Sequence, residues 1–146
     1  MGDFDFVPDI MRGAGVNILF DKVNVKPGKP TTFGIHPKTI IFGLPGNPVS
    51  SFIQFEMLVR PLISKMMGYY WCPPENVLPM AVNYKRKSAD RLGLVPVLIN
   101  KKGEVLPVDF HGSAHITALP YSDGIIAIDS GVHTIKKGVK ISVRQI

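Results

Sequence analysis

The feature that most constrains this fold is a proline-rich turn that leads directly into a long apolar helix. Residues 44–48 read Leu-Pro-Gly-Asn-Pro, and apolar residues then recur as far as residue 67. Asn47 is a favourable N-cap, Pro48 suits the first helical position, and Gly68 suits the end of the helix. We call residues 44–50 the elbow. The chain must contain a tight turn and a capped helix in direct succession.

The apolar residues after Pro48 follow helical spacing and predict a buried face. Pro61 interrupts the pattern and predicts a kink, because a proline removes one hydrogen bond from a helix. Glu56 and Arg60 stand four residues apart, which favours an ion pair on the helix surface. The residues expected on the main buried face are Phe52, Phe55, Val59, Leu62 and Met66. A second apolar stripe consists of Ile53, Leu58 and Ile63, so the helix is expected to be covered on more than one side.

Strand patterns precede the elbow and dominate after a linker at residues 69–74. The predicted fold class is therefore α/β over residues 1–70, followed by a small all-β, barrel-like domain over residues 71–146. The expected strands cover residues 16–20, 22–26, 31–34, 39–44, 92–100, 105–110, 116–119, 124–129 and 139–146.

The composition excludes several classes of protein. Of 146 residues, 45% are hydrophobic, so disorder of the whole chain is not expected. A single cysteine excludes an intrachain disulfide and fits a reducing, cytoplasmic setting. Neither a signal peptide nor a membrane span is expected. The net charge of +6 favours an anionic partner, but it is spread over both parts of the chain. We therefore predict no nucleic-acid binding, and we interpret the basic run at residues 85–87 as a solvated turn.

The elbow is one candidate anion site. Backbone N–H groups and the helix dipole meet there, Gly46 lets a ligand approach the backbone, and the Ser50 hydroxyl is a further donor. The alternative is a tight turn whose only role is to cap the helix.

A second candidate is the turn Lys-Pro-Gly-Lys-Pro at residues 26–30, which we call the lysine turn. Lys26 and Lys29 stand on a backbone stiffened by two prolines, which suits phosphate or another oxyanion. The alternative is an ordinary solvated hairpin turn.

The N-terminal residues 3–15 predict a short helix that a glycine ends. Asp3 or Asp5 can cap its start or favour its positive end. The same carboxylates can contribute to a divalent metal site. Both alternatives stay open from the residues alone.

Three segments together resemble a known family. They are Gly-Asp-Phe-Asp-Phe-Val at residues 2–7, Val-Lys-Pro-Gly-Lys-Pro at residues 25–30, and Phe-Gly-Leu-Pro-Gly-Asn-Pro-Val-Ser at residues 42–50. In this order they resemble the molybdopterin molybdotransferase family, which includes MoeA and the C-terminal part of gephyrin. The likeness extends over nearly the whole chain and is weaker over residues 71–109.

The resemblance implies the C-terminal half of a three-layer molybdopterin-binding domain over residues 1–70 and the family's C-terminal β-barrel domain over residues 71–146. It implies a role in molybdenum cofactor biosynthesis: the insertion of molybdate into adenylylated molybdopterin with release of AMP, in the presence of Mg²⁺. Asp5 would be catalytic and would bind the metal, and Lys26 and Lys29 would contact the anions. The residues expected to bind the pterin substrate are Pro45, Gly46, Asn47, Pro48 and Ser50.

Members of the family carry further domains ahead of this region. Half of a three-layer domain leaves sheet edges and apolar faces uncovered. We therefore expect a homodimer or a complementing chain, and no activity from this chain alone. The alternative function is a non-catalytic assembly or peptide-docking module, as in a gephyrin-like scaffold.

Overall fold

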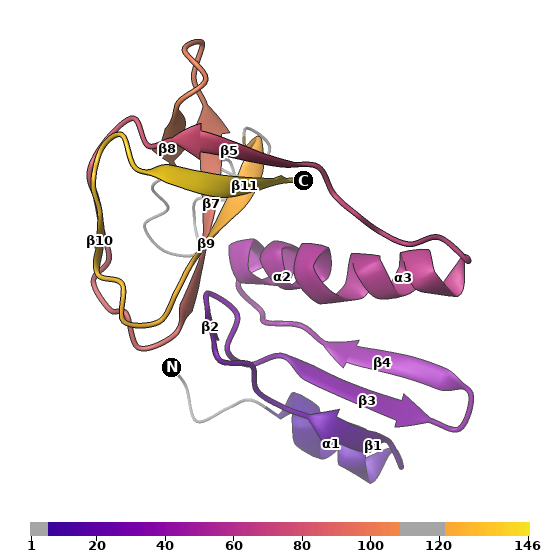
Figure 1. The fold of residues 1–146 in the computed structure, drawn as a ribbon. Coiled ribbons are helices and arrows are strands. Elements are labelled where there is room, and N and C mark those ends of the chain that lie inside the picture. Colours follow the sequence, from indigo (N-terminus) through magenta and orange to yellow (C-terminus); the bar gives the residue numbers. More distant parts are fainter. Residues whose placement is uncertain (1–5, 109–121) are drawn as a thin grey trace.

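The structure is a computed structural model that describes residues 6–108 and 122–146. Its first part is mixed α/β and its second part is built of strands, which confirms the predicted fold class (Figure 1). No helix among the described residues is long and apolar enough to span a membrane. The strand predicted over residues 116–119 lies outside the described residues. The first part contains α1 (Val7–Gly13), β1 (Asn17–Phe20), β2 (Val25–Lys26), β3 (Thr32–His36), β4 (Thr39–Gly43), α2 (Pro48–Gln54), the π-helical turn η1 (Phe55–Val59) and α3 (Arg60–Met66).

The short helix α1 begins later than the sequence suggested. Its N-cap is Phe6, which makes no side-chain capping bond. Asp3 and Asp5, the predicted capping residues, lie outside the described residues. Gly15 has a φ of 77°, and its N–H donates to the carbonyl of Arg12. A glycine therefore ends the helix in the left-handed conformation, as predicted.

A three-stranded antiparallel sheet of order β1-β3-β4 follows α1. In Figure 1 this sheet lies between α1 and the long helix formed by α2, η1 and α3. Gly34 and Gly43 face α1, because a Cβ added to either glycine would lie 2.5 Å from a valine side chain next to or within that helix. The opposite face carries the stacked rings of Phe20 and Phe33.

The elbow leads into α2 as predicted. The Asn47 side chain accepts a hydrogen bond of 3.2 Å from the backbone N–H of Ser50, and Pro48 stands in the first turn. Gly68 ends α3 with a φ of 78°. This boundary was predictable because both of its signals are local.

Pro61 alters the hydrogen-bond pattern of the helical turn that precedes it. The backbone N–H of Arg60 donates to the carbonyl of Phe55, five residues back, so η1 is a π-helical turn. Pro61 has no N–H, and the carbonyl of Glu56 therefore has no donor within the helix. Arg144, from the far end of the chain, donates to this carbonyl over 3.0 Å. Next to Pro61, where a kink was predicted, the helix has a π-helical turn, and Arg144 supplies the hydrogen bond that Pro61 cannot.

The buried face of the long helix differs from the prediction. Phe55 is 37% exposed and Met66 is 69% exposed, whereas Val49, which was not predicted, and Ile53, from the second predicted stripe, are almost wholly buried. The reason is that α2 packs against the second part of the chain, where Leu94 and Ile125 cover Val49 and Ile53. Helical spacing alone cannot identify which apolar stripe a distant sheet will cover.

The second part is one large sheet with a small ribbon beside it. Strands of the large sheet run in the order β2-β7-β9-β11-β5, with β8 added on β7, and β10 pairs with β6. Among the described residues the sheet pairing itself does not close into a barrel. Met80, directly after β5, nevertheless forms a parallel bridge with Val105 of β8, and the backbone N–H of Ala81 donates to the Val105 carbonyl over 2.8 Å, so β5 is linked to β8. The strands of the second part are β5 (Glu75–Pro79), β6 (Tyr84–Lys85), β7 (Leu92–Ile99), β8 (Val105–Pro107), β9 (Gly124–Ile128), β10 (Thr134–Ile135) and β11 (Lys140–Gln145).

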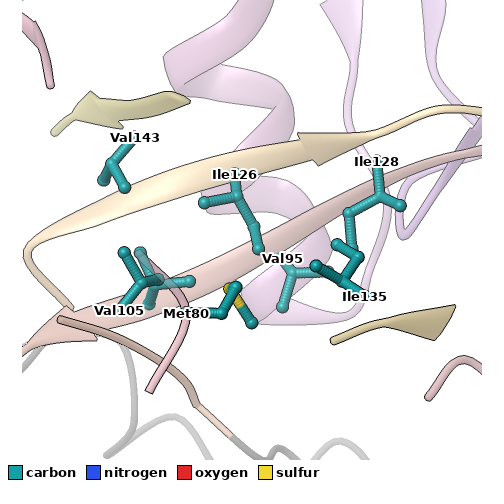
Figure 2. Packing of buried hydrophobic residues seen from close by; sticks show 8 residues of the cluster. Met80, Val95, Val105, Ile126, Ile128, Ile135 and Val143 are labelled. Atoms are coloured by element: carbon teal, nitrogen blue, oxygen red, sulfur yellow. The ribbon is translucent and has the colours of Figure 1, made fainter. Parts of the chain in front are cut away.

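The large sheet has an apolar core on each face. Because side chains alternate along a strand, Leu94 faces α2 whereas Val95 and Val97 face the opposite core. Figure 2 shows this opposite core, in which Met80 lies beneath β7 and β9. The members buried there are Met80, Val95, Val97, Val105, Ile126, Ile128, Ile135 and Val143.

Candidate functional site

The lysine turn is anchored to the second part of the chain at its start. The strand predicted over residues 22–26 is only the two-residue strand β2, and it pairs in parallel with β7. The pairing sets Val25 opposite Leu92 and Lys26 opposite Gly93. Arg91 also donates to the carbonyl of Val25 over 3.3 Å. The first lysine of the turn is therefore held against the large sheet.

Lys26 lines a pocket of about 280 Å³ together with a basic segment some sixty residues further along the chain. The pocket lies between the lysine turn and the loop after β6. Lys29 is exposed and is not among the residues that line it. The lining residues are Lys26, Pro27, Tyr84, Lys85, Arg86, Lys87, Ser88, Gly93, Leu94, Val95 and Val108. We call this cavity the basic pocket.

Arg86 is not part of a solvated turn, which corrects our interpretation of residues 85–87. Its side chain is buried, and its Nη1 donates to the carbonyls of Ile128, Asp129 and Val132 over 3.2, 3.0 and 3.3 Å. Its Nη2 donates to the carbonyl of Arg91 over 2.5 Å. A planar guanidinium can serve several carbonyls at once, and the end of β9, the loop after it and the residue before β7 offer them here.

No carboxylate pairs with Arg86 among the residues that the structure describes. Its positive charge is therefore buried against backbone carbonyls alone. Lys26, Lys85 and Lys87 add three more cations at the same pocket. A desolvated charge strongly favours a counter-ion, so the basic pocket is suited to a multiply charged anion. Sequence reasoning missed this site because the two basic segments are brought together only by the β2–β7 pairing.

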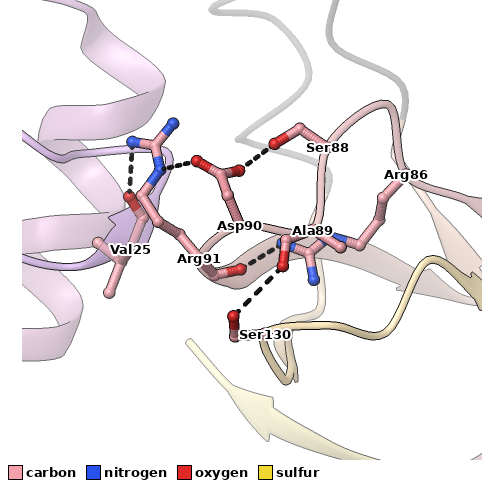
Figure 3. A network of polar contacts seen from close by, with 7 residues as sticks. All are labelled: Val25, Arg86, Ser88, Ala89, Asp90, Arg91 and Ser130. Atoms are coloured by element: carbon pink, nitrogen blue, oxygen red, sulfur yellow. Dashed lines mark hydrogen bonds and ion pairs between the residues drawn. The ribbon is translucent and has the colours of Figure 1, made fainter.

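A polar network borders the basic pocket (Figure 3). Ser88 donates a short hydrogen bond to the Asp90 carboxylate, and Arg91 Nε donates to the same carboxylate over 3.0 Å. The Ser88 hydroxyl, followed by Arg91, lowers the pKa of Asp90 from 3.8 to about 2. The network fixes Arg91, which in turn holds Val25.

This lowered pKa makes the contribution of Asp90 to stability pH-dependent. A carboxyl whose pKa is lower in the folded chain stabilises the fold above its unfolded pKa, and it loses that effect as the pH falls through the folded pKa. We expect wild-type chain to be more stable than Asp90→Asn at pH 6, and the two to converge between pH 3.8 and about 2. Urea unfolding at several pH values measures this difference. Ser88→Ala should raise the pKa of Asp90 in an NMR titration; a constant stability difference at every pH would contradict the assignment.

The elbow residues lie outside the lining of the basic pocket. Pro45 and Ser50 are buried, and the Asn47 side chain is used to cap α2. Gly46 is exposed, and a Cβ added to it would meet no atom within 4 Å. Of the predicted site residues, the structure therefore brings only Lys26 to the basic pocket. Asp5 lies outside the described residues.

The lysine turn and the elbow helix are nevertheless in direct contact. Gln54 of α2 donates to the carbonyl of Pro27 over 3.2 Å. The helix that begins in the third resemblance segment therefore contacts the second segment through Gln54. Within residues 6–108 and 122–146, no group of three His, Cys, Asp or Glu side chains is placed to hold a metal ion.

Comparison with known proteins matches both parts of the chain. Residues 1–65 match the family model described as a probable molybdopterin binding domain, and residues 78–146 match the MoeA C-terminal region, domain IV. A molybdopterin molybdenumtransferase of Staphylococcus epidermidis is 31% identical over 146 residues, and one of Haemophilus influenzae is 32% identical over 148 residues. These alignments cover 98% of this chain but 35% and 36% of the relatives. The chain thus spans about a third of the length of the curated relatives that it matches.

Solved structures share the fold. The crystal structure of a molybdopterin biosynthesis MoeA protein from Pyrococcus horikoshii superimposes with a TM-score of 0.84 at 24% identity, covering 97% of this chain and 34% of that protein. A molybdenum cofactor biosynthesis protein from Pyrococcus furiosus gives 0.77 at 21% identity, covering 96% of this chain and 52% of that one. Both family models match in succession, and the curated relatives align along almost the whole chain; the chain therefore belongs to the molybdopterin molybdotransferase (MoeA) family.

Proposed function

We propose that this chain carries part of the site at which molybdate is inserted into adenylylated molybdopterin, with release of AMP. The curated relatives named molybdopterin molybdenumtransferase support this reaction. The observation that carries the proposal is the convergence of Lys26 with the buried Arg86 at the basic pocket. Each reactant of this reaction is an anion, and each presents oxygen atoms that cationic groups recognise.

The proposed chemistry follows from the charges. Molybdate is a dianion, and adenylylated molybdopterin carries a phosphoanhydride. Lys26 and Lys29 would offset negative charge while the anhydride is cleaved and AMP leaves, because fixed cations stabilise charge that develops during a reaction. Lys85 and Lys87 border the same pocket and are added here to the expected site. Gly46 and its neighbours in the elbow remain the proposed contacts of the pterin substrate.

The resemblance also implies Mg²⁺, with Asp5 as its expected ligand. Asp5 lies outside the described residues, and those residues do not by themselves provide a metal site. The roles proposed above are therefore those of the cationic side chains, and no step is assigned to the metal. We further propose a cytoplasmic location, which agrees with the single, free cysteine.

A second chain is proposed to complete the three-layer domain over residues 1–70, either as a homodimer or as a complementing chain. The support is an incompletely covered sheet. Leu19, Ile35 and Ile40 on β1, β3 and β4 are 54%, 40% and 38% exposed. Within residues 6–108 and 122–146, the outer strands β1 and β4 each pair on one side only. Exposed apolar side chains next to open edges are typical of an interface.

Isothermal titration of the purified chain with molybdate, and separately with adenylylated molybdopterin, tests the proposed site. We expect wild-type chain to bind, and the double variant Lys26→Ala, Lys29→Ala to bind at least about tenfold more weakly, because each lysine makes a charge-assisted contact. The matched control is Lys38→Ala, Lys65→Ala, which removes the same charge at two exposed positions. Control affinity should equal that of wild type.

Two results would count against the proposal. Equal weakening of both double variants would mean that net charge, and not the lysine turn, attracts the anion. A folded chain that binds neither ligand would favour the alternative, a non-catalytic assembly module. Circular dichroism spectra of every variant establish that it is folded.

A further inference from the structure

Gln54 is a buried polar residue of α2 and follows Ile53, which packs against the large sheet. Its side chain is 2% exposed, next to Ile53 at 0%. Its amide donates to the carbonyl of Pro27 over 3.2 Å. A buried amide is costly unless it is hydrogen-bonded, and an aliphatic side chain would serve packing alone equally well. Within the described part of the chain, the hydrogen bond of this amide goes to the backbone of the lysine turn.

The amide also fits closely over the middle of that turn. A Cβ added to Gly28 would lie 2.3 Å from Gln54 Nε2 and 2.7 Å from its Cδ. Gly28 has a φ of 107°, which an L side chain rarely adopts. The glycine therefore provides both the conformation of the turn and the space that the Gln54 amide occupies.

The neighbouring carbonyls of the turn are held as well. Buried Thr31 donates to the carbonyl of Gly28 over 2.7 Å, and the backbone N–H of Val23 donates to that of Lys29 over 3.0 Å. Three consecutive carbonyls, those of residues 27, 28 and 29, thus accept hydrogen bonds. Gln54 is the donor among these that comes from the elbow helix, 27 residues away.

We propose that Gln54 is a positioning residue that holds the lysine turn in the conformation that presents Lys26 to the basic pocket. This proposal rests on the function proposed above. Gln54 itself does not line the pocket and acts through the turn. Without its bond, the turn samples other conformations, and anion binding must then first order it.

The test compares Gln54→Met with Ile53→Val. Methionine keeps an unbranched chain of similar length but has no N–H donor. Ile53→Val removes a buried methylene group from the same helical turn without touching the lysine turn, so it controls for a loss of stability. Two readouts are needed: the affinity for molybdate by isothermal titration, and the ¹H–¹⁵N signals and amide exchange of Gly28 and Lys29 in ligand-free chain.

We expect Gln54→Met to bind molybdate about fivefold more weakly or worse, the loss expected for one hydrogen bond. Its Gly28 and Lys29 amides should shift and exchange faster. Ile53→Val should melt at a lower Tm but keep wild-type affinity and wild-type turn signals.

Wild-type affinity in Gln54→Met would overturn the proposal, as would an equal loss of affinity in Ile53→Val. If wild-type chain binds no molybdate, the function proposed above fails, and the ligand-free signals decide about Gln54. If the Gly28 and Lys29 signals change in Gln54→Met but not in Ile53→Val, this would still support the conclusion that Gln54 fixes the conformation of the turn. Unchanged signals would refute it.

Discussion

Replacement of Arg86 by methionine is expected to lower the free energy of unfolding by about 3 kcal/mol or more. The substitution removes a donor that serves four backbone carbonyls, those of Ile128, Asp129, Val132 and Arg91. An unsatisfied buried polar group costs about 1–3 kcal/mol, and several are left here, although such costs are not additive. A bond to a charged donor is also stronger than a neutral one.

Urea unfolding of Arg86→Met, Arg86→Lys and Lys87→Met measures this expectation. Arg86→Lys keeps the charge but cannot reach all four carbonyls, so its stability should lie between those of wild type and Arg86→Met. Lys87 is the exposed neighbour, and Lys87→Met should change stability by less than about 0.5 kcal/mol. Equal stability of Arg86→Met and Lys87→Met would contradict a structural role for the guanidinium.

Features of this fold that depend on neighbouring residues were predictable. Asn47 caps α2, and Gly15 and Gly68 end their helices, because capping and left-handed glycines act within one turn of the chain. The ion pair between Glu56 and Arg60 also forms, with Arg60 Nη1 at 2.8 Å from Glu56 Oε2, but Glu56 is buried and does not lie on the helix surface as predicted. Local chemistry is sufficient for each of these.

Features that depend on distant contacts were missed. β5, β6 and β10 were not predicted; β6 and β10 contain only two residues each, and three of the five residues of β5 are exposed, so no clear alternation marks them. The Arg86 side chain is buried because it donates to carbonyls that lie some forty residues away in the sequence. A basic run gives no sign of whether its middle residue points into solvent or into a sheet.

In the candidate site, too, the local feature was predicted and the distant contacts were missed. Lys26 was predicted from its motif, but its partners at the basic pocket come from a segment that the β2–β7 pairing brings alongside. That pairing consists of two residue pairs, and Val25 and Leu92 are 67 positions apart, which periodicity cannot reveal. Motif resemblance therefore identified one half of the pocket, and tertiary structure supplies the other.

The two motif glycines are expected to respond oppositely to the same substitution. Gly28→Ala should lower the free energy of unfolding by about 3–5 kcal/mol, since an alanine at positive φ is strained and its methyl group collides with Gln54. Gly46→Ala should change it by less than about 0.5 kcal/mol, because the added methyl group meets no atom of the chain within 4 Å. Thermal and urea unfolding of both variants measure the contrast.

The two variants should also differ in their affinity for the ligand. Space beside Gly46 that the chain itself does not fill is available to a substrate, so Gly46→Ala should keep wild-type stability while its affinity for adenylylated molybdopterin falls. Gly28→Ala should lose both together, because it disturbs the turn that carries Lys26. Unchanged affinity in a stable Gly46→Ala chain would separate the elbow from the substrate, and would leave the basic pocket as the remaining candidate contact in the described residues.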